Sequence, residues 1–451
     1  MIRSISPQTR RVFALSLPIF AELLLQLLVG NIDQVMISKL GSAAVAAVGN
    51  GNQIMTVVII VLETMSAATT ILLTQNLGAE SGEDSCNEVA TVGLSAAALF
   101  SILTGLILFF SPHLLFGLLR TPAESFDGAC LYLKIVGGTV LVQGLYIQLC
   151  AVLRSYTLLK EVVAISVVMN LLNVAGNLLL INGWWGFPKL GIVGAAVATV
   201  CSKLAGLLLA VWILYRKCPV RFSLSYLSPF PKGTVKRLLG IAVPLGTESL
   251  SYNVSQIFIL RFINLMGTAV IATKVYASML ANVSYLYTSA ISQATQILVG
   301  YLIGAGKTEE ASQRIWSTTR IAFVISEIVT LLLLLFCDPI YNLFTTDPTI
   351  HMLGRRILLV ELALEAGRTI NIIMVKMLTT AGDVWFPVGI GIFSMWTIAV
   401  LGSRLLGLSL GWGLVGIWIA MACDECLRGI LFTIRFRRGG WKKKRLVSER
   451  K

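Results

Sequence analysis

Glu22, Gln26 and Asp33 are polar side chains within one apolar run of this sequence, residues 13–37. Glu22 and Gln26 are one helical turn apart, and Asp33 lies eleven residues after Glu22, about 20° from a full return around a helix. The three side chains would therefore share one stripe of a helix. An ionisable group at membrane depth is costly and usually marks an ion or substrate route. The spacing therefore predicts an ion or substrate route along this stripe, lined by Glu22, Gln26 and Asp33.

Two further features of the same run concern Glu22 and Pro18. Glu22 has a second interpretation, in which it pairs with a neighbouring helix for packing alone. Pro18 removes one backbone hydrogen bond, so a helix kink is expected there.

A second polar face is predicted within residues 161–182. Asn170, Asn173 and Asn177 are spaced i, i+3 and i+7, which places them on one face of a helix. Such amides can bridge helices by hydrogen bonds alone. The alternative is that they face Asp33 and help to hold a cation or a proton.

The second half of the chain carries its own polar candidates. Glu248, Tyr252 and Gln256 follow one another at intervals of four residues, again on one helix face. Glu365 and Arg368 can pair on one face of a later helix, either as a structural lock or as a functional site. All five are candidates for substrate contacts or other polar roles.

The apolar runs that must position these residues extend along the whole chain. Of the 451 residues, 56% are hydrophobic and 13% are charged, and the mean hydropathy is +0.83. Soluble domains carry roughly 25% charged residues, so lipid must form part of the solvent. A spanning helix needs about 20 apolar residues. The predicted helices are 13–37, 46–75, 89–111, 128–153, 161–182, 191–215, 238–264, 270–303, 315–337, 353–379, 384–406 and 412–434.

The first pair of predicted helices aligns without a gap with the seventh and eighth at one offset, the separation between Pro18 and Pro244. At that offset Glu22 falls on Glu248, and Ser66 with its neighbours falls on Ser292 with its neighbours. Parallel repeats of this kind pack around an axis along the membrane normal. We therefore predict an all-α polytopic membrane protein with about twelve transmembrane helices in two parallel-repeat six-helix lobes. The expected parts are a lobe at 1–215, a linker at 216–237, a second lobe at 238–435 and a basic tail at 436–451.

The cations indicate orientation rather than a nucleic-acid site. The net charge is +14, but Lys and Arg lie between apolar runs and in the tail, and they are concentrated in alternate loops. By the positive-inside rule both termini are expected in the cytoplasm. No nucleic acid partner is expected. The lipid bilayer is expected to surround the helices.

Catalytic constellations are missing from the sequence. It contains no Walker, zincin or Gly-x-Ser-x-Gly motif and only two histidines. Cys423-x-x-Cys426 lies inside an apolar run without a second cysteine pair, which favours packing over metal binding. No enzyme activity and no cofactor other than a coupling ion is expected.

Several motifs together resemble the multidrug and toxic compound extrusion (MATE) family of transporters. They are Pro18-x7-Gln26-x6-Asp33 followed by Gly41, Asn173-x3-Asn177, Gly186-x-Pro188-x-Leu-Gly191-x2-Gly194, Leu378-Thr-Thr-Ala-Gly-Asp383 and Gly413-Leu-x-Gly416-x-Trp418. The resemblance implies antiport of organic cations or drugs against Na⁺ or H⁺, with Asp33 as the coupling carboxylate and Gln26 and Asn173 nearby. Some members have an acid where this chain has Asn177 or Tyr252, so the coupling ion stays open.

The expected function is multidrug efflux by alternating access, with cationic or amphiphilic small molecules as substrates and a monomer as the working state. The first alternative is a flippase for lipid-linked saccharides, which resembles the same superfamily. A membrane enzyme or respiratory subunit is disfavoured because cofactor motifs are missing.

Overall fold

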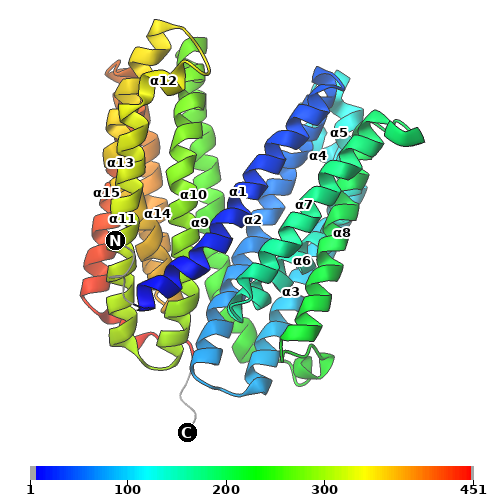
Figure 1. Ribbon diagram of the computed structural model, residues 1–451, viewed down its shortest axis with the longest axis vertical. Coiled ribbons are helices and arrows are strands. Elements are labelled where there is room, and N and C mark those ends of the chain that lie inside the picture. Colours follow the sequence, from blue (N-terminus) through cyan, green and yellow to red (C-terminus); the bar gives the residue numbers. More distant parts are fainter. Residues whose placement is uncertain (1–6, 448–451) are drawn as a thin grey trace. The chain divides into compact units, whose positions relative to one another are not determined.

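The computed structural model describes residues 7–447, and in this range every regular element is a helix (Figure 1). The α-helices are α1 (Pro7–Ser38), α2 (Ser42–Gly78), α3 (Glu83–Phe110), α4 (Pro112–Leu118), α5 (Ala123–Gly138), α6 (Val140–Ser155), α7 (Leu159–Asn182), α8 (Ile192–Lys217), α9 (Lys232–Asn264), α10 (Thr268–Gly304), α11 (Thr308–Leu335), α12 (Cys337–Tyr341), α13 (Pro348–Thr380), α14 (Trp385–Ser394) and α15 (Gly413–Arg437). Shorter 3₁₀ segments are η2 (Trp184–Gly186), η3 (Leu224–Leu227) and η6 (Gly440–Lys443), and π segments are η4 (Met395–Val400) and η5 (Ser403–Ser409).

The twelve predicted apolar runs all correspond to helical structure, and two of them are interrupted within the run. The run 128–153 is the pair α5 and α6, which meet with a bend of 45° at Thr139. The run 384–406 continues from α14 through η4 and η5. Seven of the described helices are long and apolar enough to cross a membrane, or eight with the bent pair. The prediction of an all-α polytopic membrane protein is confirmed.

The internal repeat is visible in the bounds of the helices. α2 and α10 each have 37 residues, and their first residues, Ser42 and Thr268, are equivalent in the repeat. Gly41 precedes α2 with φ 100° and ψ 168°, and Gly267 precedes α10 with φ 98° and ψ 168°. Only glycine adopts this backbone conformation without strain. The α5–α6 pair and α13 likewise occupy equal lengths of chain, although α13 is unbroken.

The chain divides into two compact units. The N-terminal unit is Ala21–Val243, and the C-terminal unit is Pro244–Lys451 with Met1–Phe20. The divisions fall inside α1, two residues after Pro18, and inside α9, directly before Pro244. The predicted lobe and linker boundaries stay a prediction, because this grouping cuts helices rather than loops.

Each unit has a buried apolar core. In the N-terminal unit the core includes Leu62, Phe116, Leu133, Val136 and Val140. In the C-terminal unit one cluster includes Val299, Ile315, Met374 and Phe432, and another includes Ile259, Ile357, Leu364, Ala399 and Ile417.

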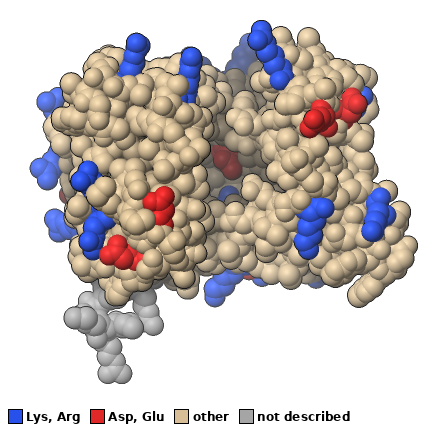
Figure 2. Space-filling model, turned by 90° about the horizontal axis from the view of Figure 1, so that it is seen from above, with Lys and Arg blue, Asp and Glu red and all other residues tan. Residues whose placement is uncertain are grey.

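The outer surface is mostly uncharged. Large apolar side chains are exposed along the long helices, among them Phe110, Leu208, Ile257 and Leu335. On the face drawn in Figure 2, Lys, Arg, Asp and Glu are scattered over an otherwise uncharged surface. Because soluble monomers rarely expose so much continuous apolar area, this surface fits contact with lipid.

The segment after the last helix of each unit docks back on that unit. In the N-terminal unit, Tyr226 donates to Asp84 at 2.9 Å and Thr234 to Glu88 at 2.6 Å, both near the start of α3. In the C-terminal unit, Trp441 is buried and stacks on Phe436 at 4.9 Å, and Lys442 pairs with Glu309 at 2.7 Å. The last residues of the predicted tail, 448–451, lie outside the described range.

Candidate functional site

Asp33 and Asn177 lie together in the N-terminal unit. Asp33 is half-buried near the C-terminal end of α1, and Asn177 is buried on α7. Asn177 Nδ2 donates to Asp33 Oδ1 at 2.8 Å. The apolar run 13–37 contains Asp33 and the run 161–182 contains Asn177, so this contact joins two elements that sequence patterns identified separately.

Asn173 completes the same cluster. We assign its amide with the nitrogen toward Asp33, because the opposite orientation brings its oxygen against acceptors only. Asn173 then donates to Asp33 Oδ1 at 2.9 Å and to Oδ2 at 3.2 Å. The buried Oδ1 of Asn177 has no hydrogen-bond partner among the described residues. The third asparagine, Asn170, leaves its buried Nδ2 unpartnered within the described range and is not part of this cluster.

Two further residues near Asp33 were not identified from the sequence. Lys203 of α8 interacts electrostatically with Asp33. Tyr132 of α5 is also within electrostatic range, and its hydroxyl donates to Asn52 Oδ1 at 3.0 Å. Lys203 is the one cation inside the apolar run 191–215, and that isolation was the available signal.

Glu22 and Gln26 have different surroundings from Asp33. Glu22 is buried and pairs with Arg154 of α6, with 2.6 Å between Glu22 Oε1 and Arg154 Nη2. This contact fits the packing interpretation of Glu22. Gln26 is exposed. Pro18 lies inside α1 as expected, in the part of the helix that belongs to the C-terminal unit.

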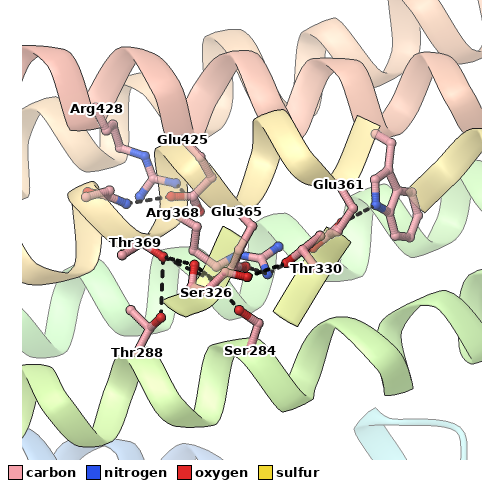
Figure 3. A network of polar contacts seen from close by, with 12 residues as sticks. Ser284, Thr288, Ser326, Thr330, Glu361, Glu365, Arg368, Thr369, Glu425 and Arg428 are labelled. Carbon is pink, nitrogen blue, oxygen red and sulfur yellow. Dashed lines mark hydrogen bonds and ion pairs between the residues drawn. The ribbon is translucent and has the colours of Figure 1, made fainter. Parts of the chain in front are cut away.

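The C-terminal unit buries a network of charged and hydroxyl side chains, drawn in Figure 3. Arg368 Nη1 lies 2.8 Å from Glu365 Oε2 and 3.1 Å from Glu361 Oε1, all three on α13. Ser284 of α10 donates to Glu365 at 2.9 Å, and Trp418 of α15 donates to Glu361 at 2.6 Å. The predicted pair therefore exists as the centre of a larger network.

A second ion-pair group on α15 adjoins this network (Figure 3). Arg428 Nη2 lies 2.5 Å from Asp424 Oδ2 and 3.0 Å from Glu425 Oε1, and Asn371 of α13 donates to Glu425 at 2.7 Å. Glu425 also interacts electrostatically with Arg368. Together the two groups contain four carboxylates (Glu361, Glu365, Asp424, Glu425) and two guanidiniums, so their formal charge is −2 when every group is ionised.

The three candidates of α9 differ in exposure. Glu248 lies against Gly391 and within electrostatic range of Arg428 and Glu425, so it adds a fifth carboxylate next to the network. Tyr252 is exposed by 44% and Gln256 is half-buried. Tyr252 is also within electrostatic range of Glu425 and Arg368.

A family model described as MatE matches this chain twice, at residues 18–179 and at residues 244–403. The chain belongs to the MATE family of transporters. The two matches start at Pro18 and at Pro244, which are equivalent in the repeat, so the family unit is the internal repeat itself. The resemblance predicted from the sequence motifs is confirmed.

Relatives of this chain align along nearly its whole length. The chain is 34% identical to the "Uncharacterized transporter YisQ" of Bacillus subtilis, covering 97% of this chain and 96% of that protein. It is 25% identical to the "Probable multidrug resistance protein NorM" of Thermotoga maritima, covering 98% and 95%. The solved structure of a variant of the Vibrio cholerae MATE transporter VcmN is 17% identical, with a TM-score of 0.89 over 97% of this chain and 99% of that one. Sequence relatives are thus transporters, and the structural match confirms the fold.

Proposed function

We propose that this MATE transporter exports cationic or amphiphilic small molecules by alternating-access antiport, with Asp33 as the coupling carboxylate. The observation that carries the proposal is the Asp33 cluster, in which a carboxylate of α1 accepts hydrogen bonds from Asn177 and Asn173 of α7. An ionised Asp33 accepts both amides, whereas protonation replaces one acceptor site by a donor. Binding and release of a cation at Asp33 would therefore change how α1 is held against α7.

Pro18 provides a way for that change to extend along α1. The helix contributes to both units, and the division between them falls two residues after Pro18. A helix lacking one backbone hydrogen bond bends more easily at that point. We propose that the state of Asp33 biases a bend near Pro18.

The chemistry around Asp33 favours H⁺ over Na⁺ as the coupling ion. Its neighbours offer donors, namely the amide nitrogens of Asn177 and Asn173, and the cation of Lys203. Na⁺ requires several oxygen ligands, and the one buried acceptor beside Asp33 without a partner in the described chain is Asn177 Oδ1. A proton needs one carboxylate oxygen. Na⁺ at Asp33 is the competing outcome of the test below.

The excess of acids in the C-terminal unit supports a cationic substrate. The two ion-pair groups around Arg368 and Arg428 together have a formal charge of −2, and Glu248 lies beside them. Buried negative charge in a membrane protein favours binding of a counter-cation. Drug export is also consistent with the "multidrug resistance" names of the NorM relatives. We further propose a monomer in the bacterial inner membrane with both termini in the cytoplasm.

The test is uptake of a fluorescent organic cation into inverted or reconstituted vesicles under an imposed pH or Na⁺ gradient. Wild-type protein should respond to the pH gradient, and Asp33→Asn should lose at least about 100-fold of the driven rate, the range expected when one essential acid–base group is removed. Asp127→Asn, the same change at an exposed acid on α5, is the matched control and should transport normally.

Three outcomes would contradict the proposal. Undiminished transport by Asp33→Asn would remove Asp33 from coupling. A response to the Na⁺ gradient alone would replace the proton by Na⁺. Translocation of a labelled lipid-linked saccharide without efflux of the cation would favour the flippase alternative.

A further inference from the structure

A groove on the C-terminal unit combines an apolar wall with two arginines. It has a volume of about 560 Å³ and lies among α11, α13 and α15. Phe323, Val324 and Ile370 form its apolar part, and Trp316, Thr319, Arg320 and Arg437 line the rest. No carboxylate of the described residues lines the groove. None of the candidate transport residues described above belongs to it.

Both arginines line the groove together with Trp316. Arg437 lies over the ring of Trp316, 5.1 Å from its centroid. Arg320 is four residues after Trp316 on α11, so it lies one helical turn further along the same face. Neither arginine forms an ion pair within the described range of the chain. Two guanidinium groups thus line one groove, and no carboxylate of the described residues neutralises them.

The position of the arginines along the helices indicates the membrane surface. Arg437 is the last residue of α15, and the segment that follows it pairs with the start of α11 through Lys442 and Glu309 at 2.7 Å. The start of α11 and the end of α15 are therefore at the same end of the unit. Trp316 lies eight residues after the start of α11, about 12 Å along its axis. This is the depth at which aromatic and basic side chains meet lipid headgroups.

We propose that this groove binds an anionic phospholipid. The headgroup phosphate would lie between Arg320 and Arg437, and an acyl chain would lie along Phe323, Val324 and Ile370. Basic pockets between helices at a membrane surface bind anionic headgroups, and a guanidinium matches phosphate in geometry as well as in charge. The apolar part of the groove favours a lipid over a free phosphate as its ligand, because a soluble anion would leave Phe323, Val324 and Ile370 uncovered.

The test is native mass spectrometry of the full chain in detergent, with phosphatidylglycerol or phosphatidylcholine added in equal amounts. Each arginine near a membrane surface contributes about fivefold to the binding of an anionic lipid. The wild type should retain phosphatidylglycerol in preference, and the double variant Arg320→Gln/Arg437→Gln should lose about 25-fold of that preference. The matched control is Arg216→Gln, which removes another arginine that lies over a tryptophan, Trp212 at 5.9 Å.

A second variant tests the apolar part without changing charge. Val324→Trp narrows the groove, and it should reduce retention of phosphatidylglycerol while both arginines remain. Glycerol phosphate should not compete with the lipid. Equal retention of both lipids by the wild type, an unchanged preference in the double variant, or full competition by glycerol phosphate would each overturn the proposal. Melting temperatures in phosphatidylcholine should be alike for all variants, which separates loss of lipid from loss of fold.

Discussion

The two repeat units have equivalent helices but differ in where their polar sites lie. Positions that carry polar site residues in one unit carry apolar core residues in the other. The repeat pairs Asp33 and Asn173 of the N-terminal unit with Ile259 and Ala399, which belong to a buried apolar cluster. In the opposite direction, aligning the start of α13 with the start of α5 pairs Glu361 and Glu365 with two core valines, Val136 and Val140. At these positions each unit therefore carries polar groups where the other has buried aliphatic side chains.

This exchange indicates that the repeat preserves backbone geometry and leaves side-chain chemistry free. The glycines before α2 and α10 keep the same positive-φ conformation, because the same turn precedes the helix in both units. The polar groups instead depend on what each helix contacts. The N-terminal cluster has one carboxylate with amide donors, and the C-terminal network has several carboxylates with two guanidiniums. We interpret the first as a small cation switch and the second as either a lock or a substrate site.

The largest effect should come from removing a guanidinium of the C-terminal network. Arg368→Gln leaves Glu361 and Glu365 buried without their cation, and breaking a buried ion pair costs about 3–5 kcal/mol. We expect a marked fall in the melting temperature in detergent. The equivalent position of the N-terminal unit is Gln143, whose buried oxygen has no partner among the described residues, so Gln143→Leu should be nearly neutral.

The double variant Glu365→Gln/Arg368→Gln sharpens the comparison. It removes one carboxylate with its cation and should regain at least half of the lost stability. Normal transport by the stabilised double variant would make the network a structural lock. Loss of transport with the fold retained would make it a substrate site. Stability of Arg368→Gln equal to the wild type would contradict both interpretations.

A smaller effect is expected from making the N-terminal site resemble its counterpart. Asn177→Ser introduces the residue found at the equivalent position of the C-terminal unit, Ser403, and removes the hydrogen bond to Asp33. A hydrogen bond to a charged group is worth about 1.5–3 kcal/mol, so the initial rate of proton-driven efflux should fall at least about tenfold. Ser403→Ala is the control and should leave the rate unchanged, since its buried hydroxyl has no partner in the described chain. Equal rates for Asn177→Ser and the wild type would remove Asn177 from the site.

Much of the fold was predictable from sequence because apolar runs and the internal repeat are properties of the chain itself. The stripe of Glu22, Gln26 and Asp33 was not sufficient to predict their surroundings. A helical stripe shows that side chains point to the same side of a helix, whereas the residues that they contact depend on the neighbouring helices. Glu22 lies against Arg154, while Gln26 is exposed. Lys203 was missed for the same reason, since its interaction with Asp33 joins two helices. Glu425 was missed although Arg428 of the same helix pairs with it, and its hydrogen bond from Asn371 comes from α13. The i, i+3 pair of Glu365 and Arg368 was predictable because both residues are on one helix.

The two units also resemble each other in how the segments after α8 and α15 dock. The smallest expected effect concerns this docking. Asp84 at the start of α3 and Glu309 at the start of α11 occupy equivalent places in the two units, and each binds the segment that follows its own unit's last helix. The C-terminal unit adds a further anchor at Asp383, in the loop between α13 and α14. Asp383 lies 2.8 Å from Arg435 Nε and 2.6 Å from Lys444 Nζ.

Asp383→Asn should weaken this anchor by about 1 kcal/mol, because Lys444 and Arg435 are partly exposed and solvent screens their charges. Burial alone would raise the pKa of Asp383, but the hydrogen bonds from Arg435 and Lys444 hold it below its ordinary value of 3.8. A lowered pKa in the folded state stabilises the protein above the ordinary pKa, and this contribution is lost as the pH falls through the lowered value. The melting temperature of the wild type should therefore exceed that of Asp383→Asn from neutral pH down to about 5, and the difference should shrink below about 4. Asp338→Asn, which breaks the exposed pair with Arg355 at 3.3 Å, should change the melting temperature less, and an equal change would mean that the docked segment adds nothing specific to the C-terminal unit.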